Sequence, residues 1–172
     1  MEISTASIKE LREQSGAGIM ACRQALIEAQ GDMDKAVETL KEQGLLLAKK
    51  KASRVANEGI IEAYIHTGGR IGAMVEVNCE TDFVARTSEF RELAHELAMQ
   101  VAAACPQVIS REEAQDVPEE ELQTACLLLQ PYIRDPAKNV QDIINQTIAK
   151  VGENIRVSRF ARFELGEQES EE

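Results

Sequence analysis

The sequence is poor in the residue types that catalysis and metal binding usually require. Its 172 residues include no tryptophan, two tyrosines, four phenylalanines and two histidines. The four cysteines stand singly, with no CxxC pair and no histidine at a metal-ligand spacing, which argues against a zinc site or a disulfide framework. We therefore expect reduced thiols, no bound metal and no cofactor.

Long apolar runs are also missing. No segment reaches the roughly 18 uncharged apolar residues that a membrane span needs. The first twenty residues already hold charged side chains from Glu2 to Glu13, so we expect no signal peptide there. The protein is accordingly expected to be cytoplasmic, with no membrane partner.

An excess of positive charge is absent as well. The formal net charge of -11 repels phosphate backbones, so we expect no direct nucleic-acid binding. A short basic run, Lys49 to Lys51 with Arg54, is typical of a solvated helix face. The acidic tail, residues 167–172, is expected to be disordered.

Recognisable catalytic motifs are lacking too. His66 and His95 have no serine or cysteine partner in a nucleophile motif. Gly68 and Gly69 are not followed by the lysine that a phosphate-binding loop needs. These absences argue against an enzyme.

What the sequence does have is helical periodicity at its start. Three segments with apolar residues at three- and four-residue spacing each end near a glycine, at Gly16, Gly31 and Gly44. Helices this short persist only when packed together, so residues 1–44 are predicted to form a three-helix domain. Residues 45–57 are expected to continue as a basic helical linker.

The rest of the chain predicts a sheet covered by helices. Two β-rich runs, 59–66 and 70–79, are joined by Thr67-Gly68-Gly69, a strong hairpin signal. An apolar stripe in 89–104 predicts a covering helix, and further helices are expected from Glu119 to Pro131 and after Asn139. With a last strand in 154–165, the fold class is α+β: a small antiparallel sheet packed with helices in a core domain at 58–166.

Two segments are candidates for partner binding. Thr81 to Val84 lies where the second strand passes into a helix. Thr81 or Asp82 could cap that helix while Phe83 enters the core, or Phe83 beside a carboxylate could project as a wedge. In Gly16 to Met20, glycines flank apolar side chains at a helix start; Ile19 and Met20 suit either docking or the helical core.

These segments resemble the elongation factor Ts family, in its compact bacterial or organellar type. The resemblance lies in Ser15-Gly16-Ala17-Gly18-Ile19-Met20-Ala21-Cys22, in Val75 through Arg86, and in Val151-Gly152-Glu153-Asn154-Ile155 with Arg159-Phe160. Ala21 and Gln24 replace the acidic and basic residues usual in the family, and the region between Glu121 and Tyr132 is shorter than in its compact members.

The resemblance implies a guanine nucleotide exchange factor for GDP-bound elongation factor Tu, acting in translation elongation. It implies a ubiquitin-associated-like first domain that docks through Lys9, Arg12, Ile19 and Met20. It also implies that Thr81, Asp82, Phe83 and Val84 reach toward the magnesium site of the partner and displace the ion. A homodimer remains a further candidate assembly.

Two other functions remain open from the residues. A ubiquitin-associated-like scaffold would bind proteins through the first domain without affecting nucleotide exchange. An RNA-binding factor would use the basic run with Arg156, Arg159 and Arg162, although the acidic total argues against it.

Overall fold

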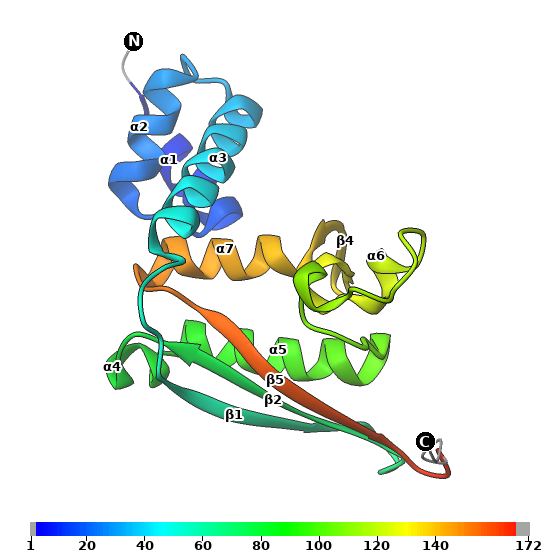
Figure 1. Ribbon diagram of the computed structural model, residues 1–172. Coiled ribbons are helices and arrows are strands. Elements are labelled where there is room, and N and C mark those ends of the chain that lie inside the picture. Colours follow the sequence, from blue (N-terminus) through cyan, green and yellow to red (C-terminus); the bar gives the residue numbers. More distant parts are fainter. Residues whose placement is uncertain (1–2, 168–172) are drawn as a thin grey trace. The chain divides into compact units, whose positions relative to one another are not determined.

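The computed structural model describes residues 3–167, which form two compact units (Figure 1). One unit contains the chain up to Arg54 together with residues 145–154, and the other contains residues 55–144 and the chain from Ile155. Of the expected acidic tail, all but Glu167 lies outside the described residues. In chain order the elements are α1 (Thr5–Ser15), α2 (Ile19–Glu28), α3 (Met33–Lys51), β1 (Glu58–Ile65), β2 (Ile71–Cys79), α4 (Asp82–Ala85), α5 (Ser88–Ala104), the 3-10 helix η1 (Arg111–Glu113), α6 (Leu122–Ala125), the 3-10 helix η2 (Leu127–Leu129), β3 (Pro131–Tyr132), β4 (Asp135–Asn139), α7 (Val140–Val151) and β5 (Arg156–Glu164).

The first unit is built from three helices with local start and stop signals. Ser4 caps α1 by accepting a hydrogen bond from the Ser7 amide at 3.0 Å, and Asp32 caps α3 through the Lys35 amide at 3.1 Å. Gly16 ends α1 in the left-handed conformation, with φ of 67°. The three helices bury one apolar cluster: Leu11, Cys22, Ala25, Leu26, Ala29 and Ala36. The predicted three-helix packing is therefore confirmed.

The prediction that the third helix ends at Gly44 is wrong. Helix α3 continues through Gly44 to Lys51, so the first part of the expected linker is its last two turns. A glycine inside a helix costs only about 1 kcal/mol relative to alanine, and the strong helix formers that follow it sustain the helix. Gly44 is buried, and Ala149 of α7 lies beside it. The glycine therefore serves close packing between helices and does not end α3.

The second unit is an antiparallel sheet in the order β1-β2-β5 with α5 along one face (Figure 1). The predicted hairpin turn is present, and Gly68 and Gly69 both have positive φ, 95° and 68°. Ala73, Val75 and Val77 alternate toward the helix and are buried. The α+β fold class is thus confirmed. Within residues 3–167 no helix has the length and apolarity needed to cross a membrane.

The segment between α5 and α7 differs from the prediction of one long helix from Glu119 to Pro131. Helix α6 makes a single turn, because Cys126 is extended and forms a parallel bridge with Val108. The Leu127 amide then donates to the carbonyl of Val108 at 2.9 Å, outside any helix. Strands β3 and β4, which were not predicted, form a second small sheet.

Alkaline pH is expected to destabilise the protein through Tyr132 in β3. Burial, followed by a hydrogen bond with Glu96, raises the pKa of the Tyr132 phenol. The resulting stabilisation is complete below the unfolded pKa of about 10 and is lost as the pH rises above it. In urea unfolding between pH 8 and 11, Tyr132→Phe should lose less stability than wild type above pH 10. The Tyr64→Phe control should follow wild type, and identical slopes for wild type and Tyr132→Phe would contradict this assignment.

Candidate partner-binding site

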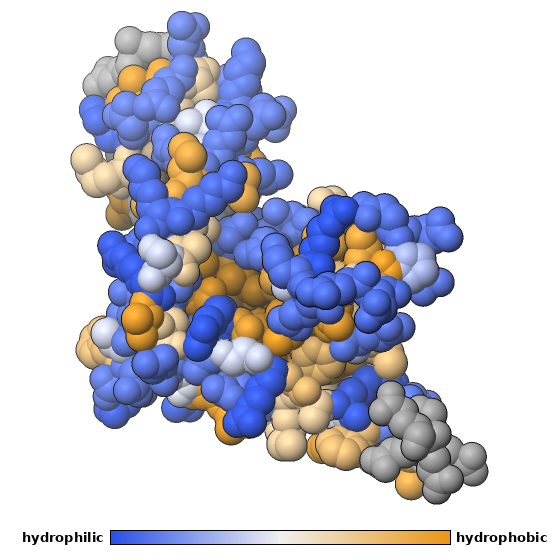
Figure 2. Space-filling view, viewed as in Figure 1, coloured by the Kyte–Doolittle hydropathy of each residue, from blue (hydrophilic) through white to orange (hydrophobic). Residues whose placement is uncertain are grey.

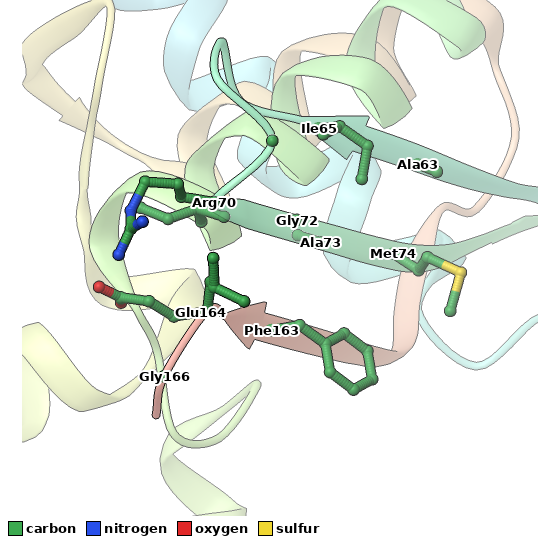
Figure 3. Close-up of a pocket in the computed structure, with 12 residues that line it drawn as sticks. Ala63, Ile65, Arg70, Gly72, Ala73, Met74, Phe163, Glu164 and Gly166 are labelled. Carbon is green, nitrogen blue, oxygen red and sulfur yellow. The ribbon is translucent and has the colours of Figure 1, made fainter. Parts of the chain in front are cut away.

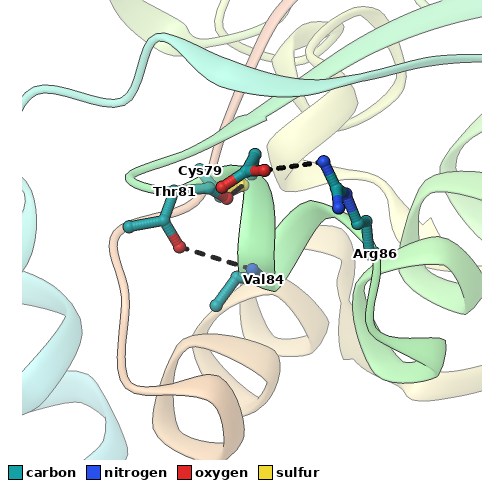
Figure 4. A network of polar contacts seen from close by, with 5 residues as sticks. Cys79, Thr81, Val84 and Arg86 are labelled. Carbon is teal, nitrogen blue, oxygen red and sulfur yellow. Dashed lines mark hydrogen bonds and ion pairs between the residues drawn. The ribbon is translucent and has the colours of Figure 1, made fainter.

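The wedge segment, residues 81–84, begins where β2 leaves the sheet. Cys79, the last residue of β2, is fully buried, and its thiol donates to the carbonyl of Thr81 at 3.1 Å. The Thr81 hydroxyl then accepts a hydrogen bond from the Val84 amide at 3.4 Å and caps α4 (Figure 4). These two contacts hold the start of α4 against the end of the strand.

The single turn of helix α4 has one side buried in the core and the other side exposed to solvent. Val84 and Ala85 are buried, whereas the side chain next to them, Phe83, is 78% exposed. The alternative in which Phe83 enters the core is therefore wrong, although the Thr81 cap that accompanied it is present. An exposed aromatic ring on a buried anchor is a feature typical of a protein-binding surface.

Asp82 makes a surface ion pair beside the ring. Its carboxylate lies 2.7 Å from the Arg86 guanidinium, and both side chains are mostly exposed (Figure 4). An exposed pair of this kind contributes little stability, so either group can exchange its partner at small cost. Thr87 follows Arg86 in the chain and caps α5, because its hydroxyl accepts a hydrogen bond from the Phe90 amide at 3.3 Å. The wedge segment therefore lies between the end of β2 and the capped start of α5. Among residues 3–167 no cluster of three or more histidine, cysteine or acidic side chains could hold a metal ion.

The second candidate, the docking turn (Gly16 to Met20), joins α1 to α2. Ile19 is 55% exposed and Met20 is 72% exposed. The helical core is completed instead by Cys22, Ala25 and Leu26, one turn further along α2. Both apolar side chains of the turn therefore remain on the surface, and neither belongs to the core.

Two basic side chains lie on α1 ahead of this turn. Lys9 and Arg12 are three residues apart, which places them on one face of the helix, and both are exposed. Lys9 lies 3.8 Å from Glu13, in a pair that is open to solvent. Lys9, Arg12, Ile19 and Met20 all belong to the first unit, while Thr81 to Val84 belong to the second.

Asn154, to which the sequence analysis gave no role of its own, fixes the chain where it leaves α3. Its side-chain amide is buried and donates to the carbonyls of Ala52 and Arg54, at 3.4 and 2.9 Å. Lys51 donates to the carbonyl of Gly152, so the end of the basic run is also held. The sequence does show an asparagine two residues after the helix-ending Gly152. Its hydrogen-bond acceptors lie about a hundred residues earlier in the chain, so the sequence pattern could not identify them.

Comparison with known proteins gives one consistent family. The family model described as "Elongation factor TS" matches residues 7–124. A protein named elongation factor Ts from Thermoanaerobacter sp. (strain X514) is 52% identical, with 96% of each chain covered. A second protein named elongation factor Ts, from Thermotoga neapolitana, is 49% identical, and the alignment covers 98% of this chain and all of that protein. These alignments span 195 and 199 positions, more than the 172 residues here, so both relatives contain residues with no counterpart in this chain.

Proposed function

The chain belongs to the elongation factor Ts family, and we propose that it releases GDP from elongation factor Tu through two surfaces, the wedge segment and the docking turn. It is a guanine nucleotide exchange factor for elongation factor Tu in translation elongation, and it acts in the cytoplasm without being an enzyme.

The exposure of Phe83 on the buried anchor of Val84 and Ala85 carries the proposal. GDP is held in a GTPase by magnesium and by backbone amides around its phosphates, so a side chain inserted there weakens both contacts. Asp82 supplies a carboxylate beside the ring that can leave Arg86 for groups around the magnesium site. Thr81 and Val84 hold the turn that presents both side chains.

The energetic demand on these surfaces is moderate. Binding of the exchange factor and binding of GDP weaken each other by the same factor, because coupling between two sites is reciprocal. Weakening GDP binding a thousandfold requires about 4 kcal/mol of coupling. An aromatic anchor together with a separate docking surface can supply differential binding of this size. No covalent step is needed.

The docking turn has a different role in this proposal. Ile19 and Met20 offer apolar surface, and Lys9 and Arg12 offer positive charge on a chain that is acidic overall. Contacts made equally before and after GDP leaves raise affinity and do not speed release. We assign residues 1–44 to a docking domain and 58–166 to the exchange core, with 45–57 connecting them.

The alternative, a ubiquitin-associated-like scaffold without exchange activity, would use the first unit alone. It gives no reason for an aromatic ring to stand exposed on α4 in the second unit. The release of fluorescent GDP from elongation factor Tu distinguishes the two functions, since a scaffold would leave the release rate unchanged.

Substitution of Met20 by alanine should weaken docking and leave the exchange step intact. We expect the concentration of exchange factor needed for half-maximal GDP release to rise about tenfold, with the maximal rate unchanged, because a docking contact acts equally throughout the reaction. Ile27→Ala, which shortens a less exposed side chain on the same helix, should match wild type. A lowered maximal rate for Met20→Ala would show that the docking turn takes part in GDP displacement.

A further inference from the structure

The face of the β1-β2-β5 sheet opposite α5 is apolar at one end and polar at the other. At the hairpin end a hollow of about 500 Å³ lies between Ile65, Met74 and Phe163, which come from three neighbouring strands (Figure 3). Orange side chains gather over this end of the strands in Figure 2. At the opposite end, where β2 passes into the wedge segment, polar side chains of β2 and β5 bond to one another.

A β-bulge in β5 brings these polar groups together. Ser158 is the extra residue, because the register of β2 against β5 shifts after Glu76. An extra residue of this kind bends its strand and re-aims a side chain. Glu76 and Asn78 are two residues apart on β2 and therefore lie on the same face. Ser158 and Arg159 are consecutive, yet both bond to this pair of side chains.

The four side chains form one hydrogen-bonded series, the Asn78 network: Arg159, Glu76, Asn78 and Ser158. Arg159 donates through Nε to the Glu76 carboxylate at 2.6 Å, and the Asn78 amide nitrogen donates to the other oxygen of that carboxylate at 3.2 Å. The Ser158 hydroxyl donates to the Asn78 amide oxygen. Asn78 is only 7% exposed, so removing either partner leaves a buried polar atom unsatisfied.

The end of β2 is also held by β1 on its other side. Gly59 of β1 has φ of 146°, a conformation that favours glycine. A Cβ atom there would lie 2.1 Å from the Val77 carbonyl oxygen and 2.8 Å from the Asn78 Cα atom, so the two backbones are too close for a side chain. The last residues of β2 are therefore fixed between Gly59 and the bulge at Ser158.

We propose that Asn78 is a positioning residue for the wedge segment, and that the Asn78 network sets the direction in which Phe83 projects. This inference rests on the proposed role of the wedge segment in GDP release. Cys79 follows Asn78 directly, and its thiol donates to the carbonyl of Thr81, whose hydroxyl caps α4. An unbroken series of contacts thus leads from β5 to the turn that carries Phe83.

The orientation of α4 depends on such support, because a single turn is too short to be stable alone. A ring that is already oriented in the free protein loses less conformational entropy when it inserts into the partner. A misplacement of about 1 Å at a reacting site can cost about a hundredfold in rate. Loss of the Asn78 network should therefore slow GDP displacement and leave the separate docking turn unaffected.

Release of fluorescent GDP from elongation factor Tu, measured by stopped flow over a range of exchange-factor concentrations, tests this inference. Ser158→Ala removes one hydroxyl and should lower the maximal rate about fivefold, with the half-maximal concentration within about twofold of wild type. Asn78→Ala, the more disruptive change, breaks two hydrogen bonds and should lower the maximal rate about tenfold. Ser158→Thr keeps the hydroxyl and should retain the wild-type rate.

Two controls separate positioning from stability. Ser110→Ala removes another half-buried hydroxyl of the second unit and should change neither the maximal rate nor the half-maximal concentration. Gln100→Leu removes a buried amide outside the Asn78 network. A loss of stability reduces the fraction of folded protein, which raises the half-maximal concentration, so Gln100→Leu should keep the wild-type maximal rate. An unchanged maximal rate in folded Ser158→Ala would overturn the inference.

A double variant with Ser158→Ala and Phe83→Ala connects the Asn78 network to the wedge segment. If the network acts through the ring, the double variant should be as slow as Phe83→Ala alone, because residues that act as a unit are not additive. Additive losses would overturn the inference, and so would a Ser158→Thr rate no faster than that of Ser158→Ala. A slow Phe83→Ala with a normal Ser158→Ala would overturn this inference alone, whereas a normal Phe83→Ala would overturn the wedge as well.

Discussion

Replacing Phe83 by alanine will lower the maximal rate of GDP release from elongation factor Tu by about thirtyfold or more, a loss that corresponds to roughly 2 kcal/mol at a binding hot spot. The side chain is on the surface of the free protein, so its removal creates no cavity in the core. The unfolding midpoint should remain that of wild type. Stopped-flow release of a fluorescent GDP analogue, at saturating exchange factor, measures the effect.

The control for this experiment is Val55→Ala. Val55 is 73% exposed, close to the exposure of Phe83, and lies in the same unit but outside the wedge segment. Val55→Ala should leave the release rate unchanged. A normal maximal rate in folded Phe83→Ala would remove Phe83 from the mechanism. An unfolded Phe83→Ala variant would show that the ring stabilises the fold around α4 and does not act through contact with the partner.

Substitution of Gln100 by leucine should destabilise the second unit by about 3 kcal/mol, because it leaves several buried polar groups without partners. Gln100 is 1% exposed on α5. Its amide nitrogen donates to the side-chain oxygen of Gln130 at 3.1 Å and to the carbonyl of Pro131 at 3.2 Å. Its amide oxygen accepts from the Ile133 amide at 3.0 Å. Leucine has a similar volume and can replace none of these bonds.

Urea unfolding followed by circular dichroism measures this loss, with Gln107→Leu as the matched control. Gln107 is exposed, so the same change there should alter stability by less than about 0.5 kcal/mol. Gln130 also donates to the carbonyls of Ala104 and Thr124, and the double variant with Gln130→Leu should lose less than the sum of the two single variants. Equal stabilities for Gln100→Leu and Gln107→Leu would show that this network adds nothing to the fold.

Local patterns predicted most of the regular structure correctly. The alternation in β2, the Gly68-Gly69 turn and the apolar stripe of α5 depend on residues within a few positions of one another, and each appears as expected. Asn139 likewise caps α7, accepting from the Asp142 amide at 2.8 Å. These signals are readable from sequence because the interactions behind them are themselves local.

Predictions failed where long-range contacts override local preference. Gly44 has the local character of a helix end, but it lies inside α3 with Ala149 beside it. Cys126 interrupts an expected helix because its segment pairs with Val108. The partners of Gln100 lie some thirty residues away, and no spacing in the sequence indicates them. The candidate site residues were proposed from their resemblance to a family, since spacing alone left two alternatives for Phe83, and their roles remain predictions.

By itself the sequence determined the family, the exchange function and the α+β class, because these depend on motifs and on periodicities that adjacent residues carry. Only the tertiary structure decided that Phe83 points outward, and that the sheet keeps one apolar face open. A single helical turn can bury either side. The packing of Val84 and Ala85 against the sheet selects which side is exposed, and that packing joins strands and helices that no local pattern connects.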